Sequence, residues 1–231
     1  MKSYVHLFFD LDNTLWDFER NSRETLTELF HEYKLESLGV SSLELFLEKY
    51  KERNAMMWDE YRHGIIDKET LRDKRFELTF WDLGLDSTTA PKELPSAYLQ
   101  LSPRKTHLFP HTHETLAYLN KKYTLHIITN GFVEAQEIKL DASDLTKYFS
   151  EIIISEHTGY KKPDINIFLY SMNKSGAKAD ECLMIGDGLE IDIVGARNAG
   201  WDTVYFNPEQ IPHQEAVTFE ISQLSELQSF L

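Results

Sequence analysis

The sequence predicts an α/β fold, a doubly wound parallel (Rossmann-like) sheet with an inserted all-helical cap domain. Short apolar runs alternate with helical patterns through residues 103–231, and strands that alternate with helices form parallel sheets. Between residues 17 and 102, helical patterns follow one another with no strand among them. We therefore expect an α/β core of residues 1–16 and 103–231 and a helical cap of residues 17–102.

The first expected strand covers residues 4–9, Tyr-Val-His-Leu-Phe-Phe, and stops at Asp10. A parallel strand that is buried on both faces has such an apolar run, and it ends in polar residues where it reaches the functional edge of the sheet. Comparable runs predict further strands, with helices between most of them. The strands are expected at 125–129, 152–155, 183–186 and 203–206, and the helices near 112–122, 133–147, 164–176 and 190–199.

The inserted segment divides into helices at its glycines. Gly39, Gly64 and Gly84 separate the helical patterns, and Asp67 and Pro91 stand where helices begin. These signals predict helices near 18–36, 42–62, 67–82 and 91–101.

Composition excludes several classes of protein. With 42% hydrophobic and 27% charged residues, the chain has the composition of an average globular protein. The net charge of −14 repels a nucleic-acid polymer, whereas a small phosphorylated substrate needs only a local cation and a few amides. No apolar run reaches the roughly 18–20 residues of a membrane helix, and the first residues lack the long apolar segment of a signal peptide, so we expect a cytoplasmic protein without a membrane partner. The single cysteine, Cys182, excludes an intrachain disulfide and a thiolate zinc site.

Acidic residues follow two of the expected strands. Asp10 and Asp12 stand two positions apart, so both carboxylates can point into one crevice, where one attacks phosphorus and the other transfers protons. Asp187 lies in a Gly-Asp-Gly sequence after another strand, with Asp192 about one helical turn further on. Hard oxygen ligands of this kind suit Mg²⁺. Either motif alone is more often a helix cap or a turn.

A hydroxyl, an amide and a lysine follow other strands. Thr129-Asn130-Gly131 comes directly after an apolar run and opens a helix, and helix N-termini favour phosphoryl oxygens. Lys162 precedes Pro163, which can open the next helix and leave the lysine as a fixed cation. Each motif alone is commonly structural. All of them, however, fall at strand ends of one parallel sheet, where ligands bind.

These motifs, in this order, make the chain resemble the haloacid dehalogenase superfamily over essentially its whole length. The residues that carry the resemblance are Asp10-x-Asp12-x-Thr14, Thr129, Lys162-Pro163, and Gly186-Asp187 with Asp192.

The resemblance implies a phosphatase mechanism with assigned roles. Asp10 would be the nucleophile that forms a phospho-aspartate, and Asp12 the general acid and base. Thr129 and Asn130 would bind the transferring phosphoryl group, and Lys162 would stabilise the charge on that group and on Asp10.

The same resemblance implies a Mg²⁺ site. Its ligands would be the Asp10 carboxylate, the Asp12 backbone carbonyl and Asp187, and Asp192 would support the metal's coordination shell.

Three further stretches are similar to the bacterial pyrimidine 5′-nucleotidase branch of the superfamily. They cover residues 12–18, 54–66 and 128–132. This similarity implies nucleoside monophosphates as substrates, with pyrimidines preferred. Aromatic and basic residues of these stretches either contact the substrate or only hold the cap together, namely Trp16, Phe18, Trp58, Tyr61 and Arg62.

Other functions remain as alternatives. A phosphatase or phosphomutase of another small metabolite, such as phosphoglycolate or a sugar phosphate, would use the same motifs. A dehalogenase is disfavoured, because a halide leaves without a proton and would not need Asp12. The non-enzyme alternative is an inactive binding or scaffold protein on the same fold. The oligomeric state stays open.

Overall fold

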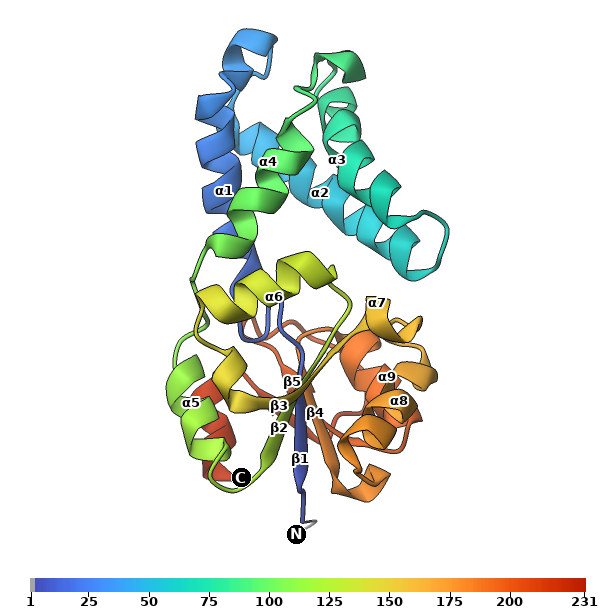
Figure 1. Cartoon of the computed structure of the whole chain (residues 1–231). Coiled ribbons are helices and arrows are strands. Elements are labelled where there is room, and N and C mark those ends of the chain that lie inside the picture. The colour runs from blue at the N-terminus through green and yellow to red at the C-terminus, as the bar shows by residue number, and fades with distance from the viewer. Residues whose placement is uncertain (1–2) are drawn as a thin grey trace. The chain divides into compact units, whose positions relative to one another are not determined.

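The computed structural model describes residues 3–231 and divides into two compact units, whose elements are labelled in Figure 1. The first unit comprises the chain up to Phe18 together with Thr106–Leu231, and the second comprises Glu19–Lys105. The division therefore lies two or three residues beyond the expected boundaries at 16/17 and 102/103.

A six-stranded parallel sheet forms the centre of the first unit. Its strands are β1 (His6–Phe9), β2 (Thr124–Thr129), β3 (Phe149–Ile154), β4 (Cys182–Gly186), β5 (Asp202–Phe206) and β6 (Phe219–Ile221). The spatial order is β3-β2-β1-β4-β5-β6, with every neighbouring pair parallel. The chain builds outward from β1 through β2 to β3 and then returns to β4 on the other side, so the order reverses at β1. The predicted fold class is therefore confirmed. In open sheets of this kind, ligands bind at the carboxyl ends of the strands, where the order reverses.

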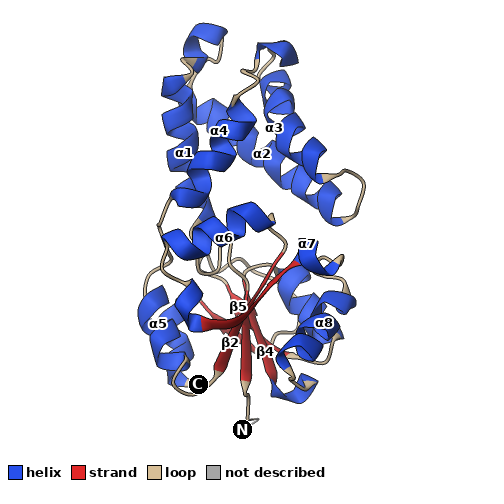
Figure 2. Cartoon of the chain, viewed as in Figure 1, coloured by secondary structure: helices blue, strands red, loops and turns tan. Residues whose placement is uncertain are grey.

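Helices cover both faces of this sheet (Figure 2). They are α5 (Thr112–Leu119), α6 (Val133–Ala142), α7 (Ser155–Thr158), α8 (Ile165–Ser175) and α9 (Gly195–Asn198). Successive side chains of a strand point to opposite faces. Leu7 and Phe9 accordingly belong to one apolar cluster with Leu116 of α5, while Phe8 belongs to another with Phe168 of α8. β1 is thus buried on both sides, as its apolar run predicts.

Helices make up the second unit. They are the greater part of α1 (Phe18–Glu32), α2 (Leu43–Arg62), α3 (Lys68–Asp82) and α4 (Leu94–Leu101). The Ser42 side chain accepts the Leu45 N–H at 3.2 Å, and Asp67 accepts the Thr70 N–H at 2.8 Å, so each caps the helix that follows it. Six of the thirteen residues in the buried cluster between these helices are aromatic, including Phe46. No helix among the described residues has the length and apolar composition that crossing a membrane requires.

The structure departs from the expected elements at a few places in the first unit. The helix expected over 133–147 ends at Ala142, and Asp144 adopts a φ of 55°, a left-handed conformation that a right-handed helix cannot include. The helix expected over 190–199 is a π-helical turn, Leu189–Val194, followed by α9. The strand β6 and the helix α7 were not expected, since each is too short for a periodic pattern.

A buried histidine pair lies on β1 and β2. His126 is 1% exposed, its Nε2 lies 3.0 Å from Nδ1 of His6, and its ring stacks on Phe8 at 4.6 Å between centroids. Burial, and to a lesser degree the nearby His6, lowers the pKa of His126 from 6.5 to about 4. Between pH 6.5 and about pH 4, His126 therefore binds a proton in the unfolded chain but not in the folded chain.

Acidification from pH 6.5 to 4 is expected to destabilise the fold through His126. The unfolded state binds more protons in this window, so the free energy of unfolding falls as the pH falls, by up to about 3 kcal/mol. Urea unfolding at several pH values measures this slope. In His126→Phe the slope should become shallower, and the exposed His157→Phe should behave like the wild type. Identical slopes in wild type and His126→Phe would contradict the assignment.

Candidate active site

Sequence-distant segments meet at the carboxyl end of β1. Asp10 follows β1 directly, Thr129 ends β2, and Asp187 follows β4. Lys162 comes from the loop before α8 and Asp192 from the π-helical turn. Thus the structure brings together the motif residues that the sequence analysis singled out, through the contacts described below.

Lys162 joins two carboxylates inside the protein. It is 2% exposed, and its Nζ lies 2.5 Å from Oδ1 of Asp10, 2.6 Å from Oδ1 of Asp192 and 2.8 Å from the Ile128 carbonyl oxygen. Burial alone would lower the pKa of Lys162, but Asp10 and Asp192 together raise it above its ordinary value. The lysine is therefore a permanent, immobile positive charge beside Asp10.

Asn130 fixes the segment that carries this lysine. Its side-chain Nδ2 donates to the Lys162 carbonyl at 2.8 Å, and its Oδ1 accepts the Lys162 N–H at 2.8 Å. The amide is thus committed to the backbone of Lys162. The second hydrogen of Nδ2 and the backbone N–H of Asn130 are left for the predicted contact with a phosphoryl group, and that contact stays a prediction.

Three carboxylates cluster at the same point. One oxygen each of Asp10, Asp187 and Asp192 lies within 4.8 Å of the others. Burial raises the pKa of Asp10 well above its usual range in spite of Lys162. Burial, followed by the charge of Asp192, raises the pKa of Asp187 to about 7. Both pKa values rise because burial and the neighbouring carboxylates destabilise the charged form of each group.

The backbone and a hydroxyl hold two of these carboxylates in place. Thr14 donates its hydroxyl to Oδ1 of Asp187 and accepts the Asp187 N–H, both at 3.1 Å. Asp192 accepts the Gly188 N–H at 2.9 Å. A Cβ on Gly186 would lie 2.4 Å from the Asp192 carboxylate, so glycine is required there for this close approach.

The donor set fits a divalent cation. Three carboxylates lie beside the Lys162 ammonium, which leaves an excess of negative charge among hard oxygen atoms. Mg²⁺ prefers oxygen ligands and is commonly held by one or two carboxylates and water. Asp10 and Asp187, both predicted as ligands, belong to this cluster, and Asp192 lies close enough to join it. The Asp12 carboxylate is not part of this cluster, so the predicted metal ligand at Asp12 is its backbone carbonyl alone.

The Asp12 side chain instead points to α6. Nζ of Lys139 lies 2.6 Å from its Oδ1, and Nε2 of Gln136 donates to its Oδ2 at 2.8 Å. Neither residue was expected from the sequence. No local pattern marks them, because the buried residues of α6 are Ala135, Gln136, Lys139 and Leu140, so its inward face is half polar.

The aromatic residues considered as substrate contacts have different surroundings. Trp16 is fully buried, with Nζ of Lys139 4.4 Å from its ring centroid, so it does not offer an open stacking face. Tyr61 is buried in the second unit, and its ring meets that of Trp58 edge-on at 5.6 Å. Arg62 donates to Asp59 at 3.1 Å.

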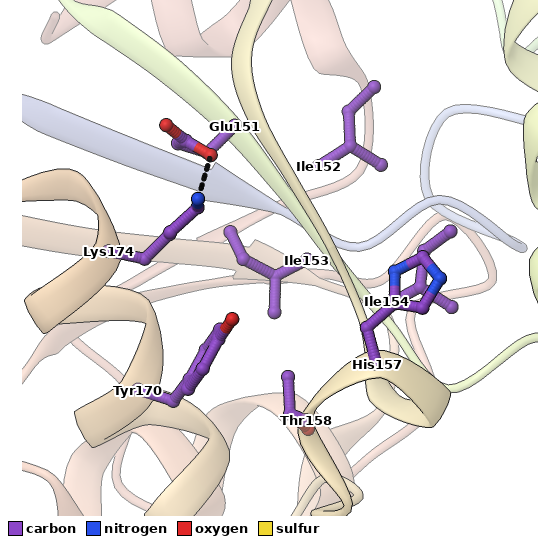
Figure 3. Close-up of a pocket in the computed structure, with 8 residues that line it drawn as sticks. All are labelled: Glu151, Ile152, Ile153, Ile154, His157, Thr158, Tyr170 and Lys174. Atoms are coloured by element: carbon purple, nitrogen blue, oxygen red, sulfur yellow. Dashed lines mark ion pairs between the residues drawn. The ribbon is translucent and has the colours of Figure 1, made fainter.

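A separate pocket lies on the outer edge of the sheet, beside β3 (Figure 3). Strand residues Ile152 and Ile153, His157 of α7 and Tyr170 of α8 contribute to its lining. Figure 3 also shows the ion pair of Glu151 and Lys174, 3.9 Å apart, at its rim. None of the predicted site residues lines this pocket.

Comparison with known protein families identifies the class of protein. Residues 4–200 match the family model of the haloacid dehalogenase-like hydrolases, and the chain belongs to this family. The predicted superfamily and the prediction of an enzyme are confirmed.

Individual relatives match over nearly the whole chain. The chain is 31% identical to the pyrimidine 5′-nucleotidase YjjG of Escherichia coli, covering 97% of this chain and 96% of the relative. It is 30% identical to the pyrimidine 5′-nucleotidase PynA of Streptococcus pneumoniae, covering 97% and 93%. The human N-acylneuraminate-9-phosphatase is 29% identical, covering 89% and 83%. Among solved structures, the magnesium-bound HAD-hydrolase YfnB of Bacillus subtilis has a TM-score of 0.88 and 28% identity, covering 99% and 98%.

Proposed function

We propose that the protein is a Mg²⁺-dependent phosphatase that hydrolyses nucleoside monophosphates through a phospho-aspartate on Asp10, with pyrimidine nucleotides preferred. The proposal rests on the pairing of Asp10 with the buried Lys162. A second carboxylate, Asp12, follows two positions later and has partners of its own. The nucleotidase relatives support the substrate class, and the 9-phosphatase relative supports phosphomonoester chemistry more generally.

The first half-reaction transfers the phosphoryl group to the protein. An Asp10 carboxylate oxygen forms a bond to phosphorus while the ester P–O bond breaks, and the electron pair of that bond leaves with the alcohol oxygen. Asp12, in its acid form, gives this oxygen a proton, so that a neutral nucleoside departs. Lys162 lies 2.5 Å from Asp10 and stabilises the negative charge that gathers on the transferring group.

The second half-reaction returns the protein to its starting state. The Asp12 carboxylate takes a proton from water as the water oxygen attacks phosphorus. The bond between Asp10 and phosphorus breaks, inorganic phosphate is released, and Asp10 is again a carboxylate while Asp12 is again an acid. Asp10, Asp187 and the Asp12 carbonyl would hold Mg²⁺, which would neutralise further charge on the phosphoryl oxygens.

Two alternative reactions, dehalogenation and phosphoryl transfer by a mutase, differ from the proposed hydrolysis in distinct ways. A halide needs no proton on departure, so a dehalogenase has no use for a second carboxylate held by Lys139 and Gln136. A phosphomutase returns the phosphoryl group to a sugar instead of releasing it. Release of free phosphate therefore distinguishes hydrolysis from a mutase reaction.

A substrate panel tests the proposal. With Mg²⁺ present, UMP, dUMP and dTMP are expected to show a kcat/KM at least about tenfold above that for phosphoglycolate, hexose phosphates and N-acylneuraminate 9-phosphate, a ratio within reach of differential pocket contacts. Pyrimidine nucleotides should also exceed AMP and GMP. Free phosphate is the measured product. A higher kcat/KM for any of the other phosphate esters would overturn the nucleotidase assignment and leave the phosphatase mechanism intact, while no phosphate release from any of them would overturn both.

A further inference from the structure

Gln136 of α6 connects two residues of the site. It is fully buried, and its Nε2 donates to Oδ2 of Asp12 and to Oγ1 of Thr129, both at 2.8 Å. In this orientation the amide nitrogen supplies a donor to both Asp12 and Thr129, which the reversed amide would not do. Both hydrogens of the amide nitrogen are therefore used to join Asp12 to Thr129.

Gly131 gives this glutamine its space. A Cβ at position 131 would lie 1.8 Å from Nε2 and 2.4 Å from Cδ of Gln136, so any side chain there would displace Gln136 from this position. The Gly131 N–H also donates to Oγ1 of Thr129 at 3.1 Å. Thr129 thus accepts two N–H donors, so its own hydroxyl hydrogen is directed away from them. A donor in that position suits a phosphoryl oxygen.

Lys139, about one helical turn beyond Gln136, holds the other oxygen of Asp12. Its Nζ is 2.6 Å from Oδ1, and the side chain is 8% exposed. The ammonium also lies over the Trp16 ring at 4.4 Å. An ion pair whose ammonium is largely buried confers orientation more than stability. Both oxygens of Asp12 are therefore fixed from α6.

We infer that Gln136 and Lys139 are positioning residues for proton transfer, holding Asp12 in place as acid and base while Gln136 also directs the Thr129 hydroxyl toward the phosphoryl group. This inference rests on the proposed function, because it takes Asp12 as the proton carrier. It gives α6 the role of holding both oxygens of Asp12, which no motif residue has. Loss of Gln136 should impair proton transfer rather than substrate binding.

Two substrates with different leaving groups test this. UMP releases an alcohol whose oxygen needs a proton, whereas p-nitrophenyl phosphate releases a phenolate that leaves without one. Gln136→Met keeps the side chain's length and removes both donors. We expect kcat for UMP to fall by about 10²-fold, within the range of general acid–base catalysis, with KM changed less than threefold.

The second substrate should reveal which step is slowed. With p-nitrophenyl phosphate, Gln136→Met should show a rapid burst of one nitrophenolate per active site and then slow turnover. The first half-reaction needs no proton from Asp12, but hydrolysis of the phospho-aspartate still needs Asp12 as base. Lys139→Met should behave similarly, and Lys139→Arg should retain most of the activity, since it keeps the charge. Glu137→Gln, at the next and exposed position of α6, is the matched control and should resemble the wild type.

The outcomes separate this inference from the function on which it rests. Equal losses on both substrates without a burst, or no loss at all, would overturn the positioning role while the active wild type upholds the phosphatase. A loss matched by a fall in Tm of Gln136→Met, with Lys139→Met resembling the wild type, would likewise reduce α6 to a structural role. A wild type that releases no phosphate would overturn the proposed function and the inference together.

Discussion

Asp10→Asn is expected to abolish phosphate release while leaving the fold intact. The amide nearly matches the carboxylate in shape but cannot form the acyl phosphate, so kcat should fall by ~10⁴-fold or more, as for other lost nucleophiles. Lys162 keeps two of its acceptors, Asp192 and the Ile128 carbonyl, so its buried ammonium remains paired. Steady-state phosphate release and thermal melting measure the two effects.

A direct assay of the intermediate sharpens this test. Wild-type protein that is quenched in acid during turnover should carry a phosphoryl group that hydroxylamine removes, and Asp10→Asn should carry none. The exposed Asp141→Asn, from the same unit, serves as the matched control and should retain both turnover and labelling. Activity of Asp10→Asn within tenfold of the wild type would rule out the phospho-aspartate mechanism.

Metal dependence should give the second large effect. Chelation with EDTA is expected to remove essentially all activity, and Mg²⁺ should restore it, because the three carboxylates leave an excess of negative charge beside the Lys162 ammonium. In Asp187→Ala the Mg²⁺ concentration for half-maximal activity should rise by about 10–100-fold, along with a fall in kcat. Zn²⁺ should substitute poorly, since the proposed ligands are all oxygens.

Calorimetric titration of Mg²⁺ into the protein separates binding from turnover. Glu190→Ala removes an exposed carboxylate from the neighbouring turn and should bind Mg²⁺ like the wild type. Undiminished activity in EDTA, or equal Mg²⁺ affinity in Asp187→Ala and Glu190→Ala, would contradict the assigned site.

Much of the fold follows from local patterns in the sequence. Buried parallel strands are apolar throughout, so β1, β2 and β4 were predicted within a few residues of their observed bounds. The helices α2 and α3 begin directly after the capping residues Ser42 and Asp67. Elements shaped by tertiary contacts were not predictable. The turn at residues 189–194 is one example, because Asp192 binds Lys162 and the Gly188 N–H there, and no local pattern encodes such contacts.

The strand-end rule accounts for part of the candidate site. Asp10, Thr129 and Asp187 stand at strand ends, which the rule for parallel sheets identifies as the ligand-binding edge. Gln136 and Lys139 lie within a helix instead, and helical periodicity alone does not show what a polar residue on an inward face will meet. Their partner Asp12 is more than a hundred positions earlier in the chain, so only the fold reveals the contact.

The central position of β1 has a consequence for how the protein acquires its site during synthesis. The register pairs His6 with Thr124 on one side and with Cys182 on the other, so β1 must wait for both of its neighbours. Such non-local pairing slows folding, whereas Glu19–Lys105 form a compact unit from one continuous stretch of the chain. Asp10 lies 152 positions before Lys162, so the two meet only after the whole stretch between them has been made. A nascent chain that stops short of Asp192 therefore carries Asp10, the proposed nucleophile, without the charged side chains that surround it in the folded protein.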